Sequence, residues 1–337
     1  MKKTKVLALI LALVLTAGCL AACGGGNAPG TTASGGTEKR SIRIAIQPSC
    51  AFIPLYIARQ TGWMDEAMKE IGVDVVWTDF ESGPPMNESF VAGQQDIGVI
   101  GDVPAVTAVA NGQKNVYIAA EEGGSFTAIL VLEDSGINSV ADLKGKKVGV
   151  VIGSTGQNML QKALASGGLD FGKDIEAVNV SMGEAQTVLI NRNVDAVVVW
   201  EPNVSRIDAV DGVKNLIAGD AVGFGGVNIV FARKEFVDSN PDIVKVFLAQ
   251  YWKATKAFKE KPEDYTAKIG EVFNLDEALL KEASSKCIYT LEFTDSVTES
   301  LQDTVSFLMG IEAIKNEINV RDFIVDDLAR EVVKENP

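Results

Sequence analysis

Residues 148–160, VGVVIGSTGQNML, join an apolar run to a glycine-bracketed turn and then to a helix-like segment. The turn consists of Gly153, Ser154, Thr155 and Gly156. Backbone N–H groups at the start of a helix, with the helix dipole behind them, can hold a phosphate, sulfonate or carboxylate group. The stretch therefore predicts an anion-binding loop, unless it is only a capped helix start, which the same residue types also form.

The spacing of this loop argues against a nucleotide. A phosphate loop of the Walker type needs G-x-x-x-x-G-K-[ST], but Gly153 and Gly156 are three residues apart and the next lysine is Lys162. The dinucleotide pattern G-x-G-x-x-G fits no better, because the preceding glycine is Gly149. The chain also contains no histidine, which removes Ser-His-Asp triads, Cys-His nucleophiles and His-bearing metal sites. We therefore predict a protein that is not an enzyme and that uses neither a cofactor nor a metal.

Further candidate residues follow the carboxyl ends of other predicted strands. Strands are expected over 42–46, 73–78, 96–100, 116–121, 128–132, 148–152, 177–180 and 196–200. Helices are expected between them over 53–68, 104–111, 140–143, 157–165 and 184–191. Ligands of open parallel sheets bind beyond the strand ends. Several of the loops there place glycine or a small hydroxyl residue directly before a helix. The predicted ligand-binding residues are Gln47, Ser49, Cys50, Phe52, Glu81, Gly101, Asp102, Ser154, Thr155, Gly156, Trp200, Glu201 and Asn228.

The N-terminus has the form of an export signal followed by a lipid anchor. Lys2, Lys3 and Lys5 precede an apolar run over 6–17 that is too short to span a bilayer comfortably. The segment LAAC ending at Cys23 matches a bacterial lipobox, in which the cysteine becomes the first mature residue and carries the lipid. The segment ending at Cys19 matches less well, and an ordinary cleaved signal is the alternative.

The lipobox and the residues after it predict where the protein is held. Residues 24–37 are rich in Gly, Ser, Thr and Pro, with few apolar residues, and are typical of a flexible tether. We predict a signal peptide over 1–22, a tether over 23–40 and a protein anchored in the bilayer at the extracytoplasmic face of the cell membrane.

Composition restricts the partners of the remaining chain. About 315 residues follow the predicted signal peptide, enough for two domains or one large one. The net charge of −14 disfavours nucleic acid and anionic membrane surfaces as partners. Cys50 and Cys287 could form a disulfide outside the cell or remain two unpaired thiols, and the sequence leaves both possibilities open.

The order of predicted elements indicates an α/β fold. Strand-like and helix-like segments alternate from residue 41 to about 232, which implies mostly parallel sheets with helices on both faces. Amphipathic helices follow over 241–314, so the chain ends in a helical return. We predict a first lobe of residues 41–124 and 225–337 and a second lobe of residues 125–224, joined by glycine-containing crossings near 122–127 and 222–228.

Several fragments resemble one group of transport proteins. They are PLYIA at 54–58 followed by GW at 62–63, AGQQDIG at 92–98, DLKGKKVG at 142–149, and DA at 195–196 leading to WEP at 200–202. With the lipobox, they make the chain similar to the nitrate/sulfonate/taurine-type substrate-binding proteins of ABC importers. The resemblance implies a two-lobed periplasmic-binding-protein type II fold and a protein that acts as a monomer. It also implies a protein that closes on a small solute and delivers it to a membrane permease with a cytoplasmic ATPase.

The resemblance leaves the solute open among sulfonates, taurine, nitrate, bicarbonate and thiamine-pyrimidine-like heterocycles. The predicted loops hold several acids but no Arg or Lys, so we hypothesise a zwitterion, or a neutral or cationic heterocycle, rather than a bare anion. Its amine would face carboxylates, and aromatic rings would form walls. The alternative is that these acids face solvent or cap helices. The acids are Glu81, Asp102, Glu121, Glu122 and Glu201, and the aromatic residues are Phe52, Phe80, Phe126 and Trp200.

Two other classes of function stay open from the sequence. One is an enzyme built on the same two-lobed fold, although the absence of histidine disfavours it. The other is a signalling or adhesion lipoprotein that uses the fold as a sensor.

Overall fold

A computed structural model describes residues 40–337, apart from Gly123 and the side chain of Glu122. The predicted signal peptide, Cys23 and the predicted tether up to residue 39 lie outside the described residues. No helix in the described part of the chain is long and apolar enough to cross a bilayer.

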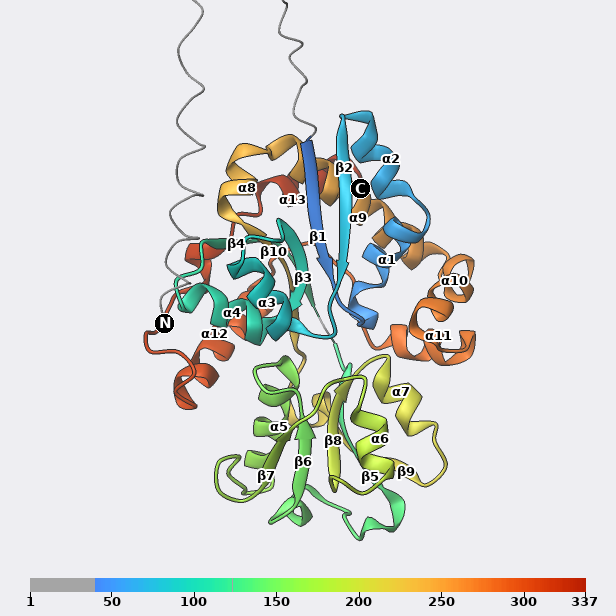
Figure 1. Ribbon diagram of the computed structural model, residues 1–337, viewed down its shortest axis with the longest axis vertical. Helices are drawn as coiled ribbons and strands as arrows, with labels where there is room; N and C mark the ends of the chain where they lie inside the picture. The colour runs from blue at the N-terminus through green and yellow to red at the C-terminus, as the bar shows by residue number, and fades with distance from the viewer. Residues whose placement is uncertain (1–39, 123) are drawn as a thin grey trace, which may run out of the picture. The chain divides into compact units, whose positions relative to one another are not determined.

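Two five-stranded sheets form the framework of the described chain (Figure 1). Sheet A has the strand order β2-β1-β3-β10-β4, and sheet B has the order β7-β6-β8-β5-β9. The strands of sheet A are β1 (Arg40–Ile46), β2 (Val73–Asp79), β3 (Ile97–Gly101), β4 (Asn115–Glu122) and β10 (Val227–Arg233). Those of sheet B are β5 (Thr127–Leu132), β6 (Lys147–Val150), β7 (Glu176–Asn179), β8 (Ala196–Trp200) and β9 (Val213–Ala218).

One strand in each sheet runs against the others. β10 is antiparallel to both β3 and β4, and β5 is antiparallel to both β8 and β9. The remaining pairs, β1 with β2 and β3 and β6 with β7 and β8, are parallel. Four of the five strands in each sheet therefore point the same way, as the sequence predicts, but four of the eight strand pairings are antiparallel, so both sheets are mixed.

The inner strands β3, β5 and β8 are apolar and buried along their length because helices cover both faces of each sheet. Along β5, Ile129 and Val131 pack in one apolar cluster with α5, while Ala128 and Leu130 pack in another with α6 and α7. In sheet A the α1, α2 and α9 residues form one cluster and the α3, α4 and α12 residues another. This double coverage explains why the strands read as continuous apolar runs in the sequence.

The helices include most of those expected, with bounds that differ by a few residues. They are α1 (Ile53–Gln60), α2 (Trp63–Glu70), α3 (Gly83–Val91), α4 (Asp102–Ala110), α5 (Thr155–Ser166), α6 (Ala185–Ile190), α7 (Asn203–Asp208), α8 (Lys234–Ser239), α9 (Pro241–Glu260), α10 (Glu263–Phe273), α11 (Glu277–Ser285), α12 (Asp295–Gly310) and α13 (Asp327–Glu335). The expected helix at 140–143 is a single 3₁₀ turn. Strands β9 and β10 and helices α3, α7, α8 and α13 were not among the predicted elements.

The chain passes between the sheets twice. It leaves β4 at Glu122 and enters β5 at Thr127, and it returns from β9 at Ala218 to β10 at Val227. Gly124 has a positive φ of 74°, and a Cβ atom there would lie 2.2 Å from the carbonyl oxygen of Lys286, so only glycine fits. A hinge at these crossings and the lobe boundaries drawn through them stay predictions.

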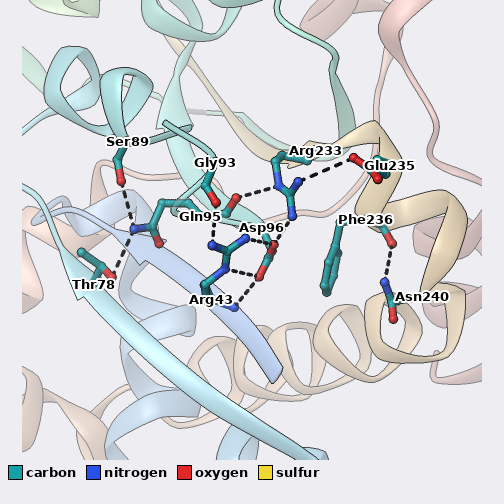
Figure 2. A network of polar contacts seen from close by, with 10 residues as sticks. All are labelled: Arg43, Thr78, Ser89, Gly93, Gln95, Asp96, Arg233, Glu235, Phe236 and Asn240. Carbon is teal, nitrogen blue, oxygen red and sulfur yellow. Dashed lines mark hydrogen bonds and ion pairs between the residues drawn. The ribbon is translucent and has the colours of Figure 1, made fainter. Parts of the chain in front are cut away.

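A buried ion network ties together the three strands that carry much of the site (Figure 2). Asp96, which precedes β3, accepts hydrogen bonds from Arg43 of β1 and Arg233 of β10, both at 2.6 Å. The Asp96 side chain is only 4% exposed. Although burial raises the pKa of Asp96, its hydrogen bonds to the two arginines lower that pKa below its usual value. The network therefore holds β1, β3 and β10 at the ends opposite Gln47, Gly101 and Asn228.

Both cysteines of the described chain, Cys50 and Cys287, are buried and free. Burial raises the pKa of the Cys50 thiol, so the group is a neutral thiol at physiological pH. The alternative of two unpaired thiols is the one found in the structure.

Candidate functional site

A small cavity lies where loops after both sheets meet. About 30 Å³ of it is open to the centre of a water molecule, room for a very small group. It is lined by Gln47, Ser49, Phe52, Gly83, Gly101, Pro104, Phe126, Ser154, Thr155, Trp200 and Asn228. The lining residues come from the ends of β1, β3, β8 and β10 and from the loops beyond β2, β4 and β6, which is where the strand-end rule predicts a ligand.

Three helices of nine or more residues begin at this cavity. Gly83 is the first residue of α3, Gly101 is the residue before α4, and Thr155 is the first residue of α5. No hydrogen bond joins the Thr155 or Gly156 N–H group to any residue that the structure describes. Helix N-termini carry partial positive charge and free N–H donors, so the cavity suits an anionic group although it is lined by no Arg or Lys.

Two lining side chains keep a buried polar atom without a partner in the described structure. They are Asn228, through the donor Nδ2, and Gln47, through the acceptor Oε1. The side chains are 4% and 5% exposed, respectively. Buried polar atoms in folded proteins nearly always have a partner, so each of these atoms indicates a place for a ligand atom or a water. Together they offer one donor and one acceptor to a bound group.

The hydroxyl residues of the opening motif have more restricted roles than the sequence suggests. Ser154 Oγ donates to the backbone oxygen of Val151 at 2.7 Å. Thr155 Oγ1 donates to Asp102 at 2.6 Å, which joins helix α5 to helix α4. A ligand in the cavity would therefore meet the α5 amides and not a free donor hydroxyl of these two residues.

Aromatic rings close the rest of the cavity. Phe52, Phe126 and Trp200 all line it and are buried. Trp200 Nε1 donates to the backbone oxygen of Pro48 at 3.2 Å, so the end of β8 is bonded to the loop after β1. Phe80, the fourth expected wall residue, does not line the cavity.

The structure gives protein partners to the two acids nearest the cavity. Asp102 is fully buried and accepts hydrogen bonds from Thr155 and Thr304, both at 2.6 Å, while burial raises its pKa. Glu201 is also fully buried, and it pairs with Lys286 at 2.6 Å and accepts a bond from Ser205 Oγ at 2.9 Å. Both carboxylates already bind protein groups, and a ligand would have to break those contacts to reach them.

Glu121 and Glu81 do not line the cavity either, and the Glu122 side chain lies outside the described structure. Glu121 accepts a hydrogen bond from Tyr251 at 2.6 Å, and burial raises its pKa well above the usual value. Glu81 is exposed and lines a different pocket. Since no carboxylate of the described chain lines the cavity, the hypothesis of a ligand amine facing these acids lacks a structural basis.

Eight predicted site residues line the cavity and five do not. Those that line it are Gln47, Ser49, Phe52, Gly101, Ser154, Thr155, Trp200 and Asn228. Asp102, Glu81 and Glu201 are placed as described above, Gly156 lies inside the first turn of α5, and Cys50 donates its backbone N–H to the Glu201 carbonyl at 3.1 Å. Gly83 and Pro104 line the cavity but were absent from the predicted residues, and Phe126 lines it as one of the expected aromatic walls. The strand-end rule had selected the loops of Gly83 and Pro104, but it does not say which residue of a loop faces inward.

The glycine at position 101 is explained by the approach of α5. A Cβ atom on Gly101 would lie 2.2 Å from Thr155 Oγ1, which is closer than atoms can approach. Gly101 is the last residue of β3 in sheet A, and Thr155 lies after β6 of sheet B. The absence of a side chain at Gly101 therefore permits the two sides of the cavity to meet.

A sequence profile described as NMT1/THI5 like matches residues 49–265, well over half of the chain. The chain belongs to this family. A Bacillus subtilis (strain 168) relative, which bears the provisional name aliphatic sulfonates-binding protein, is 30% identical over 329 residues, 97% of each chain. The resemblance to substrate-binding proteins of the sulfonate and taurine type is thereby confirmed.

Solved structures of two similar proteins have the same fold as this chain. The alkanesulfonate-binding protein SsuA of Xanthomonas axonopodis pv. citri, bound to MOPS, matches with a TM-score of 0.77 and 22% identity, covering 85% of this chain and 98% of that one. The periplasmic aliphatic sulphonate binding protein SsuA of Escherichia coli matches with a TM-score of 0.73 and 26% identity, covering 86% and 99%. These matches confirm the predicted periplasmic-binding-protein fold.

Proposed function

We propose that this protein is the solute-binding component of an ABC importer and that it holds the sulfonate group of a small organosulfonate in the cavity. The observation that carries the proposal is the set of donors there: Asn228 Nδ2, which has no partner, and the free amides at the start of α5. Neutral donors of this kind bind a singly charged oxyanion without a lysine or arginine. The names of the Bacillus and Escherichia relatives support the same ligand class.

The free acceptor of Gln47 suggests that the solute carries a hydrogen-bond donor besides the sulfonate. Its Oε1 is a buried acceptor without a partner, so it suits an N–H or O–H near the sulfonate, as in taurine or a hydroxyalkanesulfonate. This is a neutral acceptor, in contrast to the carboxylates expected from the sequence. The rings of Phe52, Phe126 and Trp200 would pack against the carbon chain.

We also propose that Cys23 carries a lipid and that the protein works as a monomer at the extracytoplasmic face, passing solute to a permease with its ATPase. The lipobox and the tether composition support the anchor. Palmitate labelling of cells expressing the wild-type chain or Cys23→Ser tests it, and equal label on both chains would contradict it.

Isothermal titration of the purified full-length protein with ethanesulfonate, taurine, nitrate and a thiamine-type aminopyrimidine tests the solute class. We expect the two sulfonates to bind and Asn228→Ala to weaken them about 10- to 100-fold, since a hydrogen bond to a charged group contributes about 1.5–3 kcal/mol. Asn215→Ala, an exposed asparagine on β9, is the control and should bind as the wild type does. Binding of the aminopyrimidine alone, or of neither sulfonate, would overturn the proposal.

A further inference from the structure

A second pocket lies beside the cavity and contains a half-buried arginine. The pocket has a volume of about 250 Å³ and is lined by Arg206 and Asn203 of α7, by Glu81 and by the prolines at 48 and 202. Pro48 adjoins Ser49, and Pro202 stands two residues after Trp200, so the segments 48–49 and 200–202 separate the pocket from the cavity. The pocket is several times larger than the cavity, of which about 30 Å³ is open to the centre of a water molecule.

Arg206 has no carboxylate partner in the described structure. Its Nε is buried without a hydrogen-bond partner, and its guanidinium donates only to the amide oxygen of Asn203. Burial lowers the pKa of Arg206, whereas hydrogen bonds to carboxylates raise the pKa of Arg43 and Arg59. A partly desolvated cation without a counterion is unfavourable, and an anion that fits the pocket relieves this.

Glu81 is the one acid that lines the pocket, and it makes no ion pair with Arg206 among the described contacts. Its side chain is exposed, so its charge is screened by water and costs little to displace. Nε is buried and Nη2 already donates to Asn203, so the donors that remain on the planar guanidinium are the ones offered to a carboxylate.

We propose that Arg206 and Asn203 bind a carboxylate at the far end of the solute, so that the preferred solutes are short sulfonates that also carry a carboxylate. The inference rests on the proposed function, because the sulfonate occupies the cavity. Pro48 and Pro202 belong to loops of different sheets, and the Trp200–Pro48 and Cys50–Glu201 hydrogen bonds join these loops in the structure. The solute therefore enters before those bonds form and ends with one charged group on each side of the loops.

Paired titrations of the full-length protein with propanesulfonate and sulfopropionate test the subsite, since the two solutes differ only in the terminal carboxylate. We expect sulfopropionate to bind about tenfold more tightly than propanesulfonate, because one charge-assisted hydrogen-bonded pair adds about that much affinity. Arg206→Gln should remove that advantage and leave propanesulfonate unchanged, and Arg206→Lys should keep part of it. Glu81→Gln should increase the advantage, because a competing anion is removed.

Arg192→Gln is the matched control, since Arg192 makes an exposed pair with Asp134 and should change neither affinity. Equal wild-type affinity for the two solutes, or an equal loss of both in Arg206→Gln, would overturn the subsite while leaving the proposed function standing. Absence of any sulfonate binding would overturn both. If free acetate tightens propanesulfonate binding only when Arg206 is present, the site takes a separate anion and the two-headed solute is excluded.

Discussion

Asp102 joins the two sides of the cavity through one carboxylate. Its two oxygens accept from Thr155 at the start of α5 and from Thr304 of α12, both at 2.6 Å. The Thr304 bond lies among helices packed on sheet A, while the Thr155 bond reaches the helix that follows sheet B. Substituting each threonine in turn therefore distinguishes the contribution of Asp102 to closing the cavity from its contribution to the stability of the fold.

Thr155→Val removes the bond across the cavity and keeps the side-chain volume. We expect ethanesulfonate to bind about tenfold more weakly, because the closed form loses a buried charge-assisted hydrogen bond worth about 1.5 kcal/mol or more. The melting temperature should change little. Thr304→Val should do the opposite, lowering the melting temperature more than the affinity. Equal effects of both variants on both quantities would contradict this division.

The acids also show why the site could be predicted only in part. The strand-end rule finds Gln47, Gly101, Ser154 and Trp200 because a strand's direction and its last residue are local properties. Whether an acid faces a ligand depends on residues far along the chain. Glu201 meets Lys286, which is 85 residues away, and Asp102 meets Thr304, which is 202 residues away. No local pattern reveals those partners.

At the scale of elements, the Asp96 network aligns three strands of sheet A. β1, β3 and β10 carry or precede Gln47, Gly101 and Asn228, so a shift in any of the strands would move the cavity wall. The network consists of one buried carboxylate between two arginines that are about one-quarter to one-third exposed. It is the kind of buried pair whose loss is costly because the remaining charges stay partly desolvated.

Asp96→Asn should therefore destabilise the fold by about 3 kcal/mol at neutral pH. The folded pKa of Asp96 is below the unfolded value of about 3.9. Its contribution is thus complete above the unfolded pKa and is lost as the pH falls through the folded pKa. Denaturant unfolding at pH 7 and below pH 3 should show a difference between wild type and variant that shrinks in acid.

Asp79→Asn is the control for this experiment. Asp79 pairs with Arg59 at 2.7 Å, but its side chain is 58% exposed, so its loss should cost less than about 1 kcal/mol. A cost for Asp96→Asn no larger than the control's would contradict a structural role for the network.

Elements formed by strong local patterns could be predicted, and those formed by distant pairing could not. The apolar runs of β1, β3, β6 and β8 and the amphipathic pattern of α9 are visible in the sequence. β10 was missed because it follows a glycine-rich turn and is fixed by pairing with β3 and β4, more than 100 residues earlier. α7, with six residues, is too short for a helical period to stand out.

At the scale of the whole described chain, the cavity requires the sides of sheets A and B to meet. They are joined by the Thr155–Asp102, Trp200–Pro48 and Lys286–Glu201 contacts. Gly101 is the point where this approach leaves no space for a side chain, since a Cβ atom would lie 2.2 Å from Thr155 Oγ1. The position therefore tests closure without removing any bonded group.

Gly101→Ala should reduce ethanesulfonate affinity at least tenfold while the protein stays folded, because φ at residue 101 is −70° and alanine fits the backbone there. Adding Thr155→Ala, which removes the obstructing Oγ1, should restore part of the affinity. Gly310→Ala, where an added Cβ meets nothing within 4 Å, is the control. Small-angle scattering with ethanesulfonate should show a more extended Gly101→Ala protein, and an unchanged compact form would contradict the prediction.

The position of β10 also determines when each sheet can be completed during synthesis. β10 lies between β3 and β4, so the edges of those two strands have no partner until residue 233 has been made. Sheet B uses only residues between 127 and 218 and is complete earlier. β1, β2 and β3 can pair with one another early, but β4 and one edge of β3 lack their partner until β10 exists. If the predicted export signal acts as the sequence suggests, late completion of sheet A keeps the N-terminal half incompletely folded while the chain crosses the membrane.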